Sequence, residues 1–165
     1  MSILSMNQMV IRAAELSDSA MLSVLCLTVW TDTYALYGLE PAYADYMLDE
    51  FSPANMQTKI SSKVVWIAEL DSRLVGVMVF SPVDREIETL YMLRRFKGMG
   101  IGGAFLRKLR VNVDGAVYLS CWEGNSPAIQ FYRAMGLEEA GEDYFSLDGQ
   151  QHRNIRFCMP EGWGL

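Results

Sequence analysis

Polar and apolar residues alternate over positions 86–92, and apolar residues then recur at helical spacing over 101–110. The first pattern is typical of a β-strand and the second of an amphipathic α-helix. Between them, residues 97–103 read Lys-Gly-Met-Gly-Ile-Gly-Gly. Glycine loses more backbone entropy on folding than any other residue. So many glycines in one short loop therefore indicate a backbone whose N–H groups are approached closely by a ligand.

The remaining pattern predicts a single α/β domain over residues 1–165. We expect strands over 8–13, 64–69, 74–80, 116–122, 145–147 and 150–159, and helices over 18–34, 42–50, 53–60 and from 125 to Gly136. Ser52-Pro53 supplies a helix cap followed by proline at the first helical position, and Asp148-Gly149 is typical of a two-residue hairpin turn. The order of elements predicts a mixed sheet with helices on its faces.

The glycine loop leads into the first turn of a helix, where unpaired N–H groups and the helix dipole favour an anion. Residues 94–110 contain six basic and no acidic side chains, which suits a phosphate group. A Walker loop is excluded, because Gly103 is followed by Ala104 and Phe105 instead of Lys-Ser/Thr. The loop therefore predicts a phosphate-binding site of another kind.

Two alternatives remain for this loop. Gly98, Gly100 and Gly103 match the dinucleotide fingerprint literally, and Glu123 has the spacing of a ribose-binding acid. However, residues 93–97 separate the strand from the loop, and the 42 residues after Glu123 are too few for the rest of a doubly wound sheet. A glycine-rich turn without any ligand is the other alternative.

Charge is distributed unevenly along the chain. The net charge is −6, with +4 on residues 61–110 and −5 on each of the segments 1–60 and 111–165. One basic block in an acidic chain suits an anionic cofactor with a cationic substrate nearby. Nucleic-acid-binding proteins present a broad basic surface instead, so we expect no nucleic-acid partner.

Cysteine and histidine usage limits the chemistry further. Three scattered cysteines without a C-x-x-C pair (Cys26, Cys121, Cys158) are expected to be buried thiols in the cytoplasm. His152 is the only histidine, which argues against a histidine metal site or a Ser-His triad, and we expect no metal. Residues 1–10 do not resemble a signal peptide and no apolar run reaches membrane-spanning length, so we expect no membrane association.

A second motif occupies residues 125–137, which read Asn-x-x-Ala-x-x-Phe-Tyr-x-x-x-Gly-Leu. On a helix, Ala128 and Phe131 share one face and Tyr132 lies beside it. Taken alone, the pattern is also typical of a helix whose aromatic side chains pack in the core. Its place after the glycine loop favours a second cofactor-binding segment.

Together the two motifs resemble those of the GNAT superfamily of acyl-CoA-dependent N-acyltransferases. Lys97-x-x-Gly100-x-Gly102 matches the motif Q/R-x-x-G-x-G/A except for the lysine, and residues 125–137 match Asn-x-x-Ala-x-x-Phe-Tyr-x-x-x-Gly-Phe except for Leu137. The order of elements is also similar to that of the superfamily. Within it, the chain is similar to PaiA-type bacterial polyamine acetyltransferases, in segments 31–34, 46–51, 86–91 and 122–125.

The resemblance implies a largely antiparallel central sheet with a V-shaped cleft, and acetyl-CoA as the cosubstrate in that cleft. It implies that an amine attacks the thioester directly in a ternary complex, that Tyr132 is the general acid for the departing thiolate, and that the Met92 N–H polarises the acetyl carbonyl. Many relatives are dimers, so the resemblance also implies a possible homodimer. The residues implied to bind the cofactor are Tyr91, Met92, Leu93, Lys97, Gly98, Met99, Gly100, Ile101, Gly102, Gly103, Asn125, Ala128, Phe131 and Tyr132.

The candidate residues for the amine acceptor follow from the protonation state of the amine and from residue type. An alkylammonium must lose a proton before it attacks, which costs roughly 4–5 kcal/mol at neutral pH. Glu86 and Glu88 lie two apart on one strand and so face the same side, which makes one of them the candidate base; two solvated carboxylates are the alternative. Trp30 and Tyr34 are candidates for lining the acceptor pocket through cation–π contacts, with core packing as the alternative.

The sequence therefore predicts an acetyl-CoA-dependent N-acetyltransferase for a primary amine, with a small cationic amine or polyamine favoured. Acetylation of a protein N-terminus or of a lysine side chain is an alternative. A non-catalytic acyl-CoA-binding regulatory domain is an alternative of another class.

Overall fold

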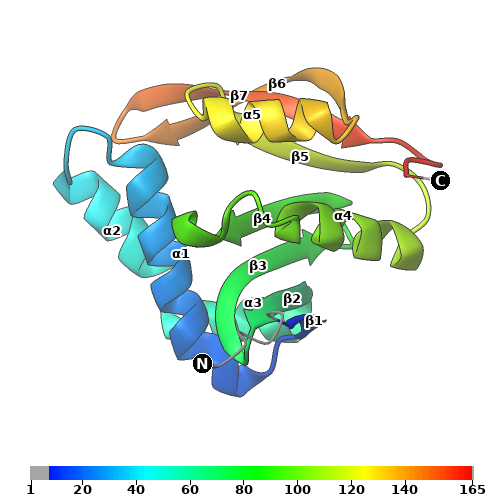
Figure 1. Cartoon of the computed structure of the whole chain (residues 1–165). Helices are drawn as coiled ribbons and strands as arrows, with labels where there is room; N and C mark the ends of the chain where they lie inside the picture. The colour runs from blue at the N-terminus through cyan, green and yellow to red at the C-terminus, as the bar shows by residue number, and fades with distance from the viewer. Residues whose placement is uncertain (1–7, 165) are drawn as a thin grey trace, which may run out of the picture.

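The computed structural model describes residues 8–164. Within this range, seven strands form one sheet in the order β1-β2-β3-β4-β5-β7-β6 (Figure 1). Neighbouring strands are antiparallel except β4 and β5, which are parallel. The strands are β1 (Met9–Ala13), β2 (Val64–Leu70), β3 (Arg73–Ser81), β4 (Glu86–Met92), β5 (Val117–Trp122), β6 (Glu138–Leu147) and β7 (Gln150–Met159). The expected mixed, largely antiparallel sheet is confirmed.

Helices cover both faces of this sheet, as expected. Helices α1 (Ser19–Tyr34), α2 (Pro41–Glu50) and α3 (Pro53–Ser62) pack with one face of β2 and β3, and α4 (Ile101–Asn112) and α5 (Ser126–Ala134) pack on the other. Two short 3₁₀ turns that the sequence did not predict lie at Leu16–Asp18 and Arg94–Phe96. No helix within residues 8–164 has the length and apolar character needed to cross a membrane.

Local signals explain several helix ends. The Ser52 side chain accepts a hydrogen bond from the Asn55 N–H (3.1 Å) at the start of α3, which satisfies one of the unpaired N–H groups there. Helix α5 ends where Gly136 adopts a φ of 81°, and the Leu137 N–H donates to the Tyr132 carbonyl at 3.1 Å. This is the Schellman arrangement that a glycine after the last helical turn predicts.

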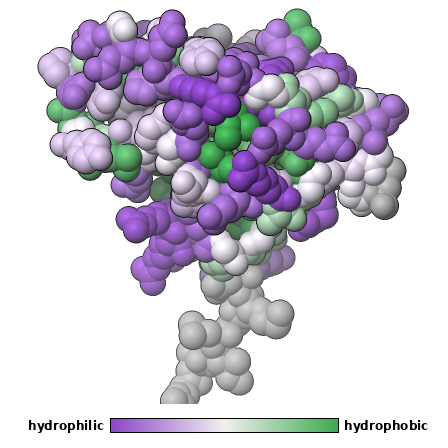
Figure 2. All heavy atoms as spheres, turned by 90° about the horizontal axis from the view of Figure 1, so that it is seen from above, coloured by the Kyte–Doolittle hydropathy of each residue, from purple (hydrophilic) through white to green (hydrophobic). Residues whose placement is uncertain are grey.

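Strand β6 is much longer than the predicted strand over 145–147. It begins at Glu138, and its residues 138–142 are exposed. The sequence failed here because acidic side chains on an edge strand leave no apolar alternation, and pairing with β7 alone defines the strand. Figure 2 shows this side of the molecule from above, and it is mostly hydrophilic.

The predicted burial is confirmed for two of the three cysteines and is wrong for the third. Cys26 and Cys121 are buried, whereas Cys158 is only partly buried, and all three are free thiols. Cys158 lies on β7 opposite Glu138 of the edge strand.

Asp18 links the start of α1 to the sheet. It stands before the first turn of α1, but its side chain does not cap that helix. Its carboxylate instead accepts two hydrogen bonds from the Arg12 guanidinium (2.9 and 3.0 Å) and one from the Glu15 N–H (2.7 Å). Arg12 also donates to Glu69 of β2. The Asp18 carboxylate, buried against α1, therefore fastens the start of that helix to β1 and β2.

We expect Asp18→Asn to lower the free energy of unfolding at pH 7 by about 1–3 kcal/mol, because Arg12 and the Glu15 N–H lose a charged acceptor. Hydrogen bonds from Arg12 are the main cause that lowers the pKa of Asp18. Its stabilisation is therefore complete above the ordinary carboxyl pKa of about 4 and is lost as the pH falls through the lowered value.

Urea unfolding of wild type and Asp18→Asn at pH 7 and pH 3 measures this effect, and the difference between the two proteins should narrow at pH 3. Asp148→Asn, in the β6–β7 turn with a φ of 52°, is the control and should change stability by less than about 0.5 kcal/mol. An Asp18→Asn difference that is the same at both pH values would contradict the account.

Candidate active site

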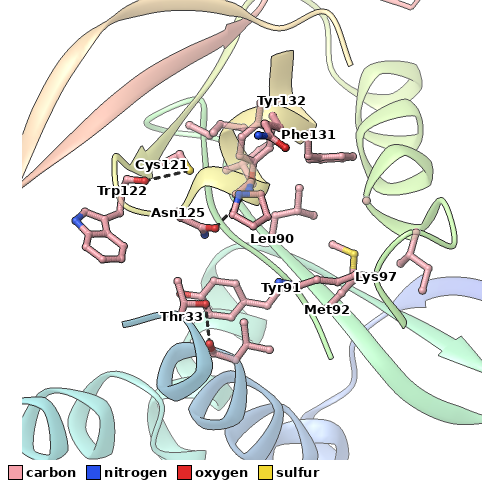
Figure 3. A pocket seen from close by; sticks show the side chains of 18 of the residues that line it. Thr33, Leu90, Tyr91, Met92, Lys97, Cys121, Trp122, Asn125, Phe131 and Tyr132 are labelled. Atoms are coloured by element: carbon pink, nitrogen blue, oxygen red, sulfur yellow. Dashed lines mark hydrogen bonds between the residues drawn. The ribbon is translucent and has the colours of Figure 1, made fainter. Parts of the chain in front are cut away.

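Strands β4 and β5 are neighbours only where they begin. The register pairs Glu86 with Tyr118 and Ile87 with Leu119, and extends no further. Beyond these pairs the strands separate, and a cavity of about 670 Å³ lies between them, walled by β4, β5, the start of α4 and α5 (Figure 3). This arrangement is the V-shaped cleft that the sequence predicts.

A shift in register marks the point of separation. Phe80 pairs with Ile87 and Val79 pairs with Thr89, so Glu88 has no partner on β3. An extra residue of this kind bends its strand and increases the local twist. Glu88 therefore stands where β4 turns away from β5.

The separated part of β4 exposes backbone donors to the cavity. The Leu93 N–H donates to the Val75 carbonyl of β3 at 2.9 Å. Because hydrogen bonds alternate along an antiparallel pair, the N–H groups of Met92 and Leu90 face the opposite edge, toward the gap left by β5. The N–H of Met92, the predicted donor to the acetyl carbonyl, thus lies on the side of the cleft, and Leu90 supplies a second donor.

The start of α4 supplies further donors. Gly100 is the residue before the helix; its φ is 82°, and no side chain caps the turn. The first intrahelical bond runs from the Ala104 N–H to the Gly100 carbonyl (3.0 Å). A Cβ on Gly100 would meet no atom within 4 Å, so the backbone here faces open space at the cavity. The N–H groups of the first turn are available to an anion.

Other glycines of the loop serve packing. A Cβ on Gly102 would lie 2.8 Å from the Phe131 ring of α5, so this glycine allows α4 and α5 to approach closely. Of the six basic residues over 94–110, only Lys97 lines the cavity. Lys108 lies over the Trp66 ring (5.1 Å to its centroid), and Arg110 donates to the carbonyls of Val113 and Gly115. Lys108 and Arg110 therefore make structural contacts away from the cavity.

Tyr132 is buried on α5 and lines the cavity. Its ring packs against Phe131 and Phe157, with centroid distances of 5.2 and 5.4 Å. Burial is the main cause that raises the pKa of Tyr132 above its ordinary value of 10, and Cys121 and Tyr34 raise this pKa further. The phenol therefore remains protonated at neutral pH and is able to donate a proton.

The cavity brings together most of the predicted cofactor residues. Those that line it are Tyr91, Met92, Lys97, Gly98, Gly100, Ile101, Gly102, Asn125, Ala128, Phe131 and Tyr132, whereas Leu93, Met99 and Gly103 do not. Figure 3 shows Tyr91 and Met92 of β4 across the cavity from Asn125, Phe131 and Tyr132. The Asn125 side chain accepts a hydrogen bond from the Ala128 N–H (3.3 Å), so its oxygen caps α5 and its amide N–H groups are left for a ligand.

Sequence reasoning missed several lining residues. Val29 and Thr33 of α1, Phe96, Cys121 and Trp122 also line the cavity. Thr33 and Trp122 lie in segments that carried the family resemblance, which was a usable signal. The others are apolar residues whose place in the cavity depends on the tertiary fold.

A second, smaller cavity of about 190 Å³ adjoins the first. It is lined by both predicted bases, Glu86 and Glu88, and by both predicted acceptor residues, Trp30 and Tyr34. It also contains Tyr46, Phe145, His152 and Asn154, which the sequence did not indicate. The residues that line both cavities are Tyr34, Ile87, Glu88, Tyr91, Ser120 and Trp122.

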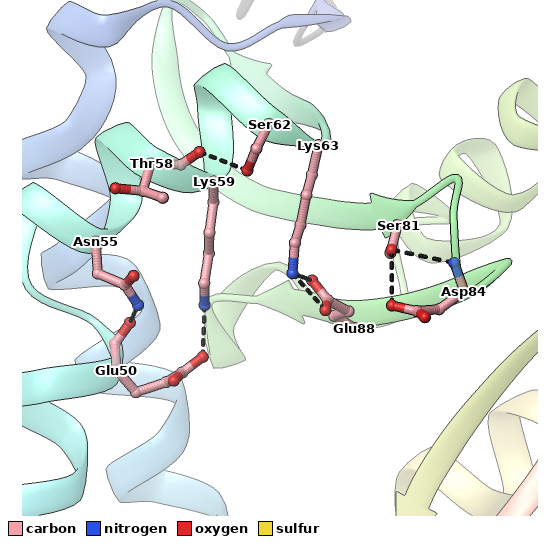
Figure 4. Close-up of polar contacts among 9 residues, drawn as sticks. All are labelled: Glu50, Asn55, Thr58, Lys59, Ser62, Lys63, Ser81, Asp84 and Glu88. Carbon is pink, nitrogen blue, oxygen red and sulfur yellow. Dashed lines mark hydrogen bonds and ion pairs between the residues drawn. The ribbon is translucent and has the colours of Figure 1, made fainter.

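The two glutamates face the same cavity, as predicted, but their surroundings differ. Both oxygens of Glu88 accept hydrogen bonds from the Lys63 ammonium at 2.5 Å (Figure 4). Glu86 lies 3.6 Å from Arg156, which also lies 3.7 Å from Asp143. Burial is the main cause that raises the pKa of Glu86, and Arg156 opposes it. Glu86 is thus the carboxylate with the weaker ion pair.

The cleft offers amide donors, a lysine and a phenol. Within residues 8–164, no cluster of three His, Cys, Asp or Glu side chains is placed to hold a metal ion. The donor set therefore suits an anionic ligand that the backbone binds directly.

Comparison with known proteins agrees with this geometry. The acetyltransferase (GNAT) family matches residues 28–137. The fold is similar to a PaiA N-acetyltransferase from Thermoplasma acidophilum in complex with coenzyme A (TM-score 0.71, 19% identity, 90% of this chain and 98% of that chain). It is also similar to a ribosomal-protein-alanine N-acetyltransferase from Brucella melitensis (TM-score 0.65, 19% identity, 92% and 99% covered). A spermidine N-acetyltransferase, SpeG, from Vibrio cholerae is a third (TM-score 0.65, 15% identity, 93% and 94% covered).

The family match extends from α1 to the end of α5 and includes both motifs, the separated strands and the lining of the larger cavity. The chain therefore belongs to the acetyltransferase (GNAT) family of acetyl-CoA-dependent N-acetyltransferases.

Proposed function

We propose that the protein transfers an acetyl group from acetyl-CoA to a small cationic primary amine, by direct attack in a ternary complex. The observation that carries the proposal is the junction of the two cavities. The larger one presents backbone donors and a buried phenol, and the smaller one presents two carboxylates among aromatic side chains. A donor of acetyl groups and a cationic acceptor would meet at the residues that line both.

The residues of the larger cavity fit acetyl-CoA, which supplies an activated acetyl thioester when bound. The N–H groups of the first turn of α4, together with Lys97, would hold its phosphates. The open space in front of Gly100, where a Cβ would meet nothing, supports this assignment. The N–H groups of Leu90 and Met92 would receive the backbone amides and the carbonyl of the ligand, as a strand partner does.

Two features support direct attack with Tyr132 as the acid. Burial raises the pKa of Cys121, the cysteine in the cleft, to about 11. This side chain is therefore a thiol at neutral pH, which disfavours a covalent acyl-cysteine route. Tyr132 retains its proton and lines the same cavity, so it would donate that proton to the departing sulfur.

Glu86 is our choice for the group that accepts the proton of the amine. Glu88 stands at the junction of the cavities, but Lys63 engages both of its oxygens. The raised pKa of Glu86 brings it closer to the operating pH, which favours proton transfer by a general base. Glu88 would then attract and orient the ammonium group.

Polyamines are the favoured acceptors within this class. The similarity to PaiA and to a spermidine N-acetyltransferase supports this choice, and the aromatic and acidic lining of the smaller cavity suits an organic cation. The similarity to a ribosomal-protein-alanine N-acetyltransferase keeps a protein N-terminus or lysine as the alternative. A non-catalytic acyl-CoA-binding domain is disfavoured, because both cavities retain groups suited to proton transfer.

We extend the proposal to a cytoplasmic enzyme with one domain over residues 1–165. The free state of Cys26, Cys121 and Cys158 supports a reducing compartment. A homodimer stays a prediction from the family resemblance.

Gly100→Val should weaken coenzyme A binding by at least about tenfold. A β-branched residue is strained at a φ of 82°, and its methyl groups would fill the space in front of the α4 N–H groups. Isothermal titration with coenzyme A measures this loss. Gly149→Val, which places the same strain at a φ of 74° in the β6–β7 turn, should bind coenzyme A normally. Equal affinities of the two variants for coenzyme A would show that the glycine loop does not bind this ligand.

Tyr132→Phe should lower kcat by roughly 10²–10⁴-fold and leave coenzyme A affinity nearly unchanged, since only the proton donor is lost. Steady-state release of free thiol and titration with coenzyme A measure the two quantities. Tyr144→Phe, on the exposed side of β6, is the control and should keep wild-type kcat. A wild-type kcat in Tyr132→Phe would exclude the phenol as the acid.

Glu86→Gln should lower kcat by about 10²-fold or more, while Glu88→Gln should chiefly raise the KM for the amine. Because the proton acceptor must be ionised, wild-type activity should fall as the pH drops through the raised pKa of Glu86, and Glu86→Gln should lose this acidic limb. pH profiles of kcat for the three proteins test the assignment. A wild-type profile in Glu86→Gln would transfer the role to another group.

A further inference from the structure

The outer wall of the smaller cavity joins two elements that are far apart in the sequence. Tyr46 of α2 meets the Phe145 ring of β6 nearly edge to face, with centroids 5.3 Å apart. Tyr46 also contacts the Trp30 ring of α1 at 5.6 Å, and Leu147 packs against the same helical cluster. Figure 1 shows the β6–β7 hairpin reaching the side of the molecule where α1 and α2 lie.

Strand β6 is organised around this contact. Among its residues, only Asp143, Phe145 and Leu147 are partly buried, and the others are exposed. Alternate residues of a strand point to one face, so these three share the face that meets the cavity and α2. Tyr144 lies on the opposite face, where its hydroxyl donates to Glu142 at 3.1 Å. The strand thus turns a single large aromatic side chain, Phe145, toward the acceptor side.

The smaller cavity has little room for a large acceptor. The cavity of about 190 Å³ is smaller than the roughly 300–1,000 Å³ of sites for drug-sized ligands. A polypeptide acceptor needs room beyond its amine, because each further extended residue adds about 3.3–3.6 Å of chain. The Tyr46–Phe145 contact bridges α2 and β6 at one side of the cavity, so a chain that left by that side would have to displace it.

The charges in and around the cavity favour a cationic ligand. Glu86 and Glu88 line the cavity. Asp143 outside its lining adds a third carboxylate, against the two cations Lys63 and Arg156 that pair with these groups. The rings of Trp30, Tyr34 and Trp122 add faces suited to an ammonium group. A compact amine with a positive charge therefore matches both the volume and the electrostatics.

We propose that Tyr46 and Phe145 are specificity-determining residues, whose contact admits a compact free amine and excludes the amine of a polypeptide. The inference rests on the proposed function, in which the acceptor occupies this cavity. It assigns the choice between a small amine and a protein acceptor to one aromatic contact between α2 and β6.

The experiment compares two acceptors of equal charge, 1,4-diaminobutane and the tripeptide amide Ala-Ala-Arg-NH₂, which has one acylatable amine. The ratio of kcat/KM for the peptide to that for the diamine is measured by thiol release for wild type, Phe145→Ala, Tyr46→Ala and Phe145→Leu. Tyr144→Ala, which removes the neighbouring aromatic ring on the opposite face, is the matched control. Coenzyme A titration of each variant confirms that its cofactor site is intact.

We expect the wild type to prefer the diamine, and the ratio to rise at least about tenfold in Phe145→Ala and Tyr46→Ala, less in Phe145→Leu and not at all in Tyr144→Ala. An unchanged ratio in Phe145→Ala with normal coenzyme A affinity would overturn the inference. A wild type that prefers the peptide would overturn it as well.

A wild type that acetylates neither amine would contradict the proposed function instead. The role of the Tyr46–Phe145 contact is then tested by binding of the two amines. Trp30 and Trp122 line the cavity, so their fluorescence reports whether it is occupied. The diamine should quench the wild type and the peptide should quench only Phe145→Ala and Tyr46→Ala. Equal quenching of the wild type by both amines would contradict the inference that the Tyr46–Phe145 contact excludes a peptide.

Discussion

The separation of β4 from β5 is the constraint on which the rest of the site depends. Two parallel strands that pair at only two positions, Glu86 with Tyr118 and Ile87 with Leu119, leave backbone N–H and C=O groups without strand partners. Such groups are costly to bury unpaired. The fold leaves them at the wall of a cavity, where a ligand with amides and carbonyls of its own is able to replace the missing strand.

The elements around the gap hold this arrangement open. Helix α4 begins at the gap, and Gly102 lets it approach the Phe131 ring of α5 closely. The Schellman end of α5 and the packing of Tyr132 on Phe157 then fix the phenol at the wall. Gly102 therefore serves helix packing, whereas Gly100, two residues earlier, faces open space, although the sequence presents both as parts of one loop.

Local patterns were sufficient for most of the fold and for the cofactor side of the site. The strand over 86–92, the glycine loop and the segment 125–137 each carry their signal in short-range spacing, and the structure brings them to one cavity. Residues 138–144 of β6 could not be predicted as a strand, because acidic residues on an edge strand show no alternation of polar and apolar positions. The roles of the basic residues over 94–110 could not be predicted either. Only tertiary contacts show that Lys108 packs on Trp66 and that Arg110 donates to a backbone carbonyl.

The acceptor side depended on contacts between distant elements. Spacing alone placed Glu86 and Glu88 on one face, but their difference arises from Lys63 and Arg156, which come from other parts of the chain. Phe145 and His152 reach the cavity only because the β6–β7 hairpin folds toward α1 and α2.

The most direct test of the account is release of free thiol from acetyl-CoA in the presence of single primary amines, from 1,4-diaminobutane and spermidine to a lysine peptide, with coenzyme A binding measured in parallel. The account predicts binding of coenzyme A and turnover with at least one of the small cationic amines well above that with the peptide. Absence of coenzyme A binding, or turnover with the peptide alone, would contradict it.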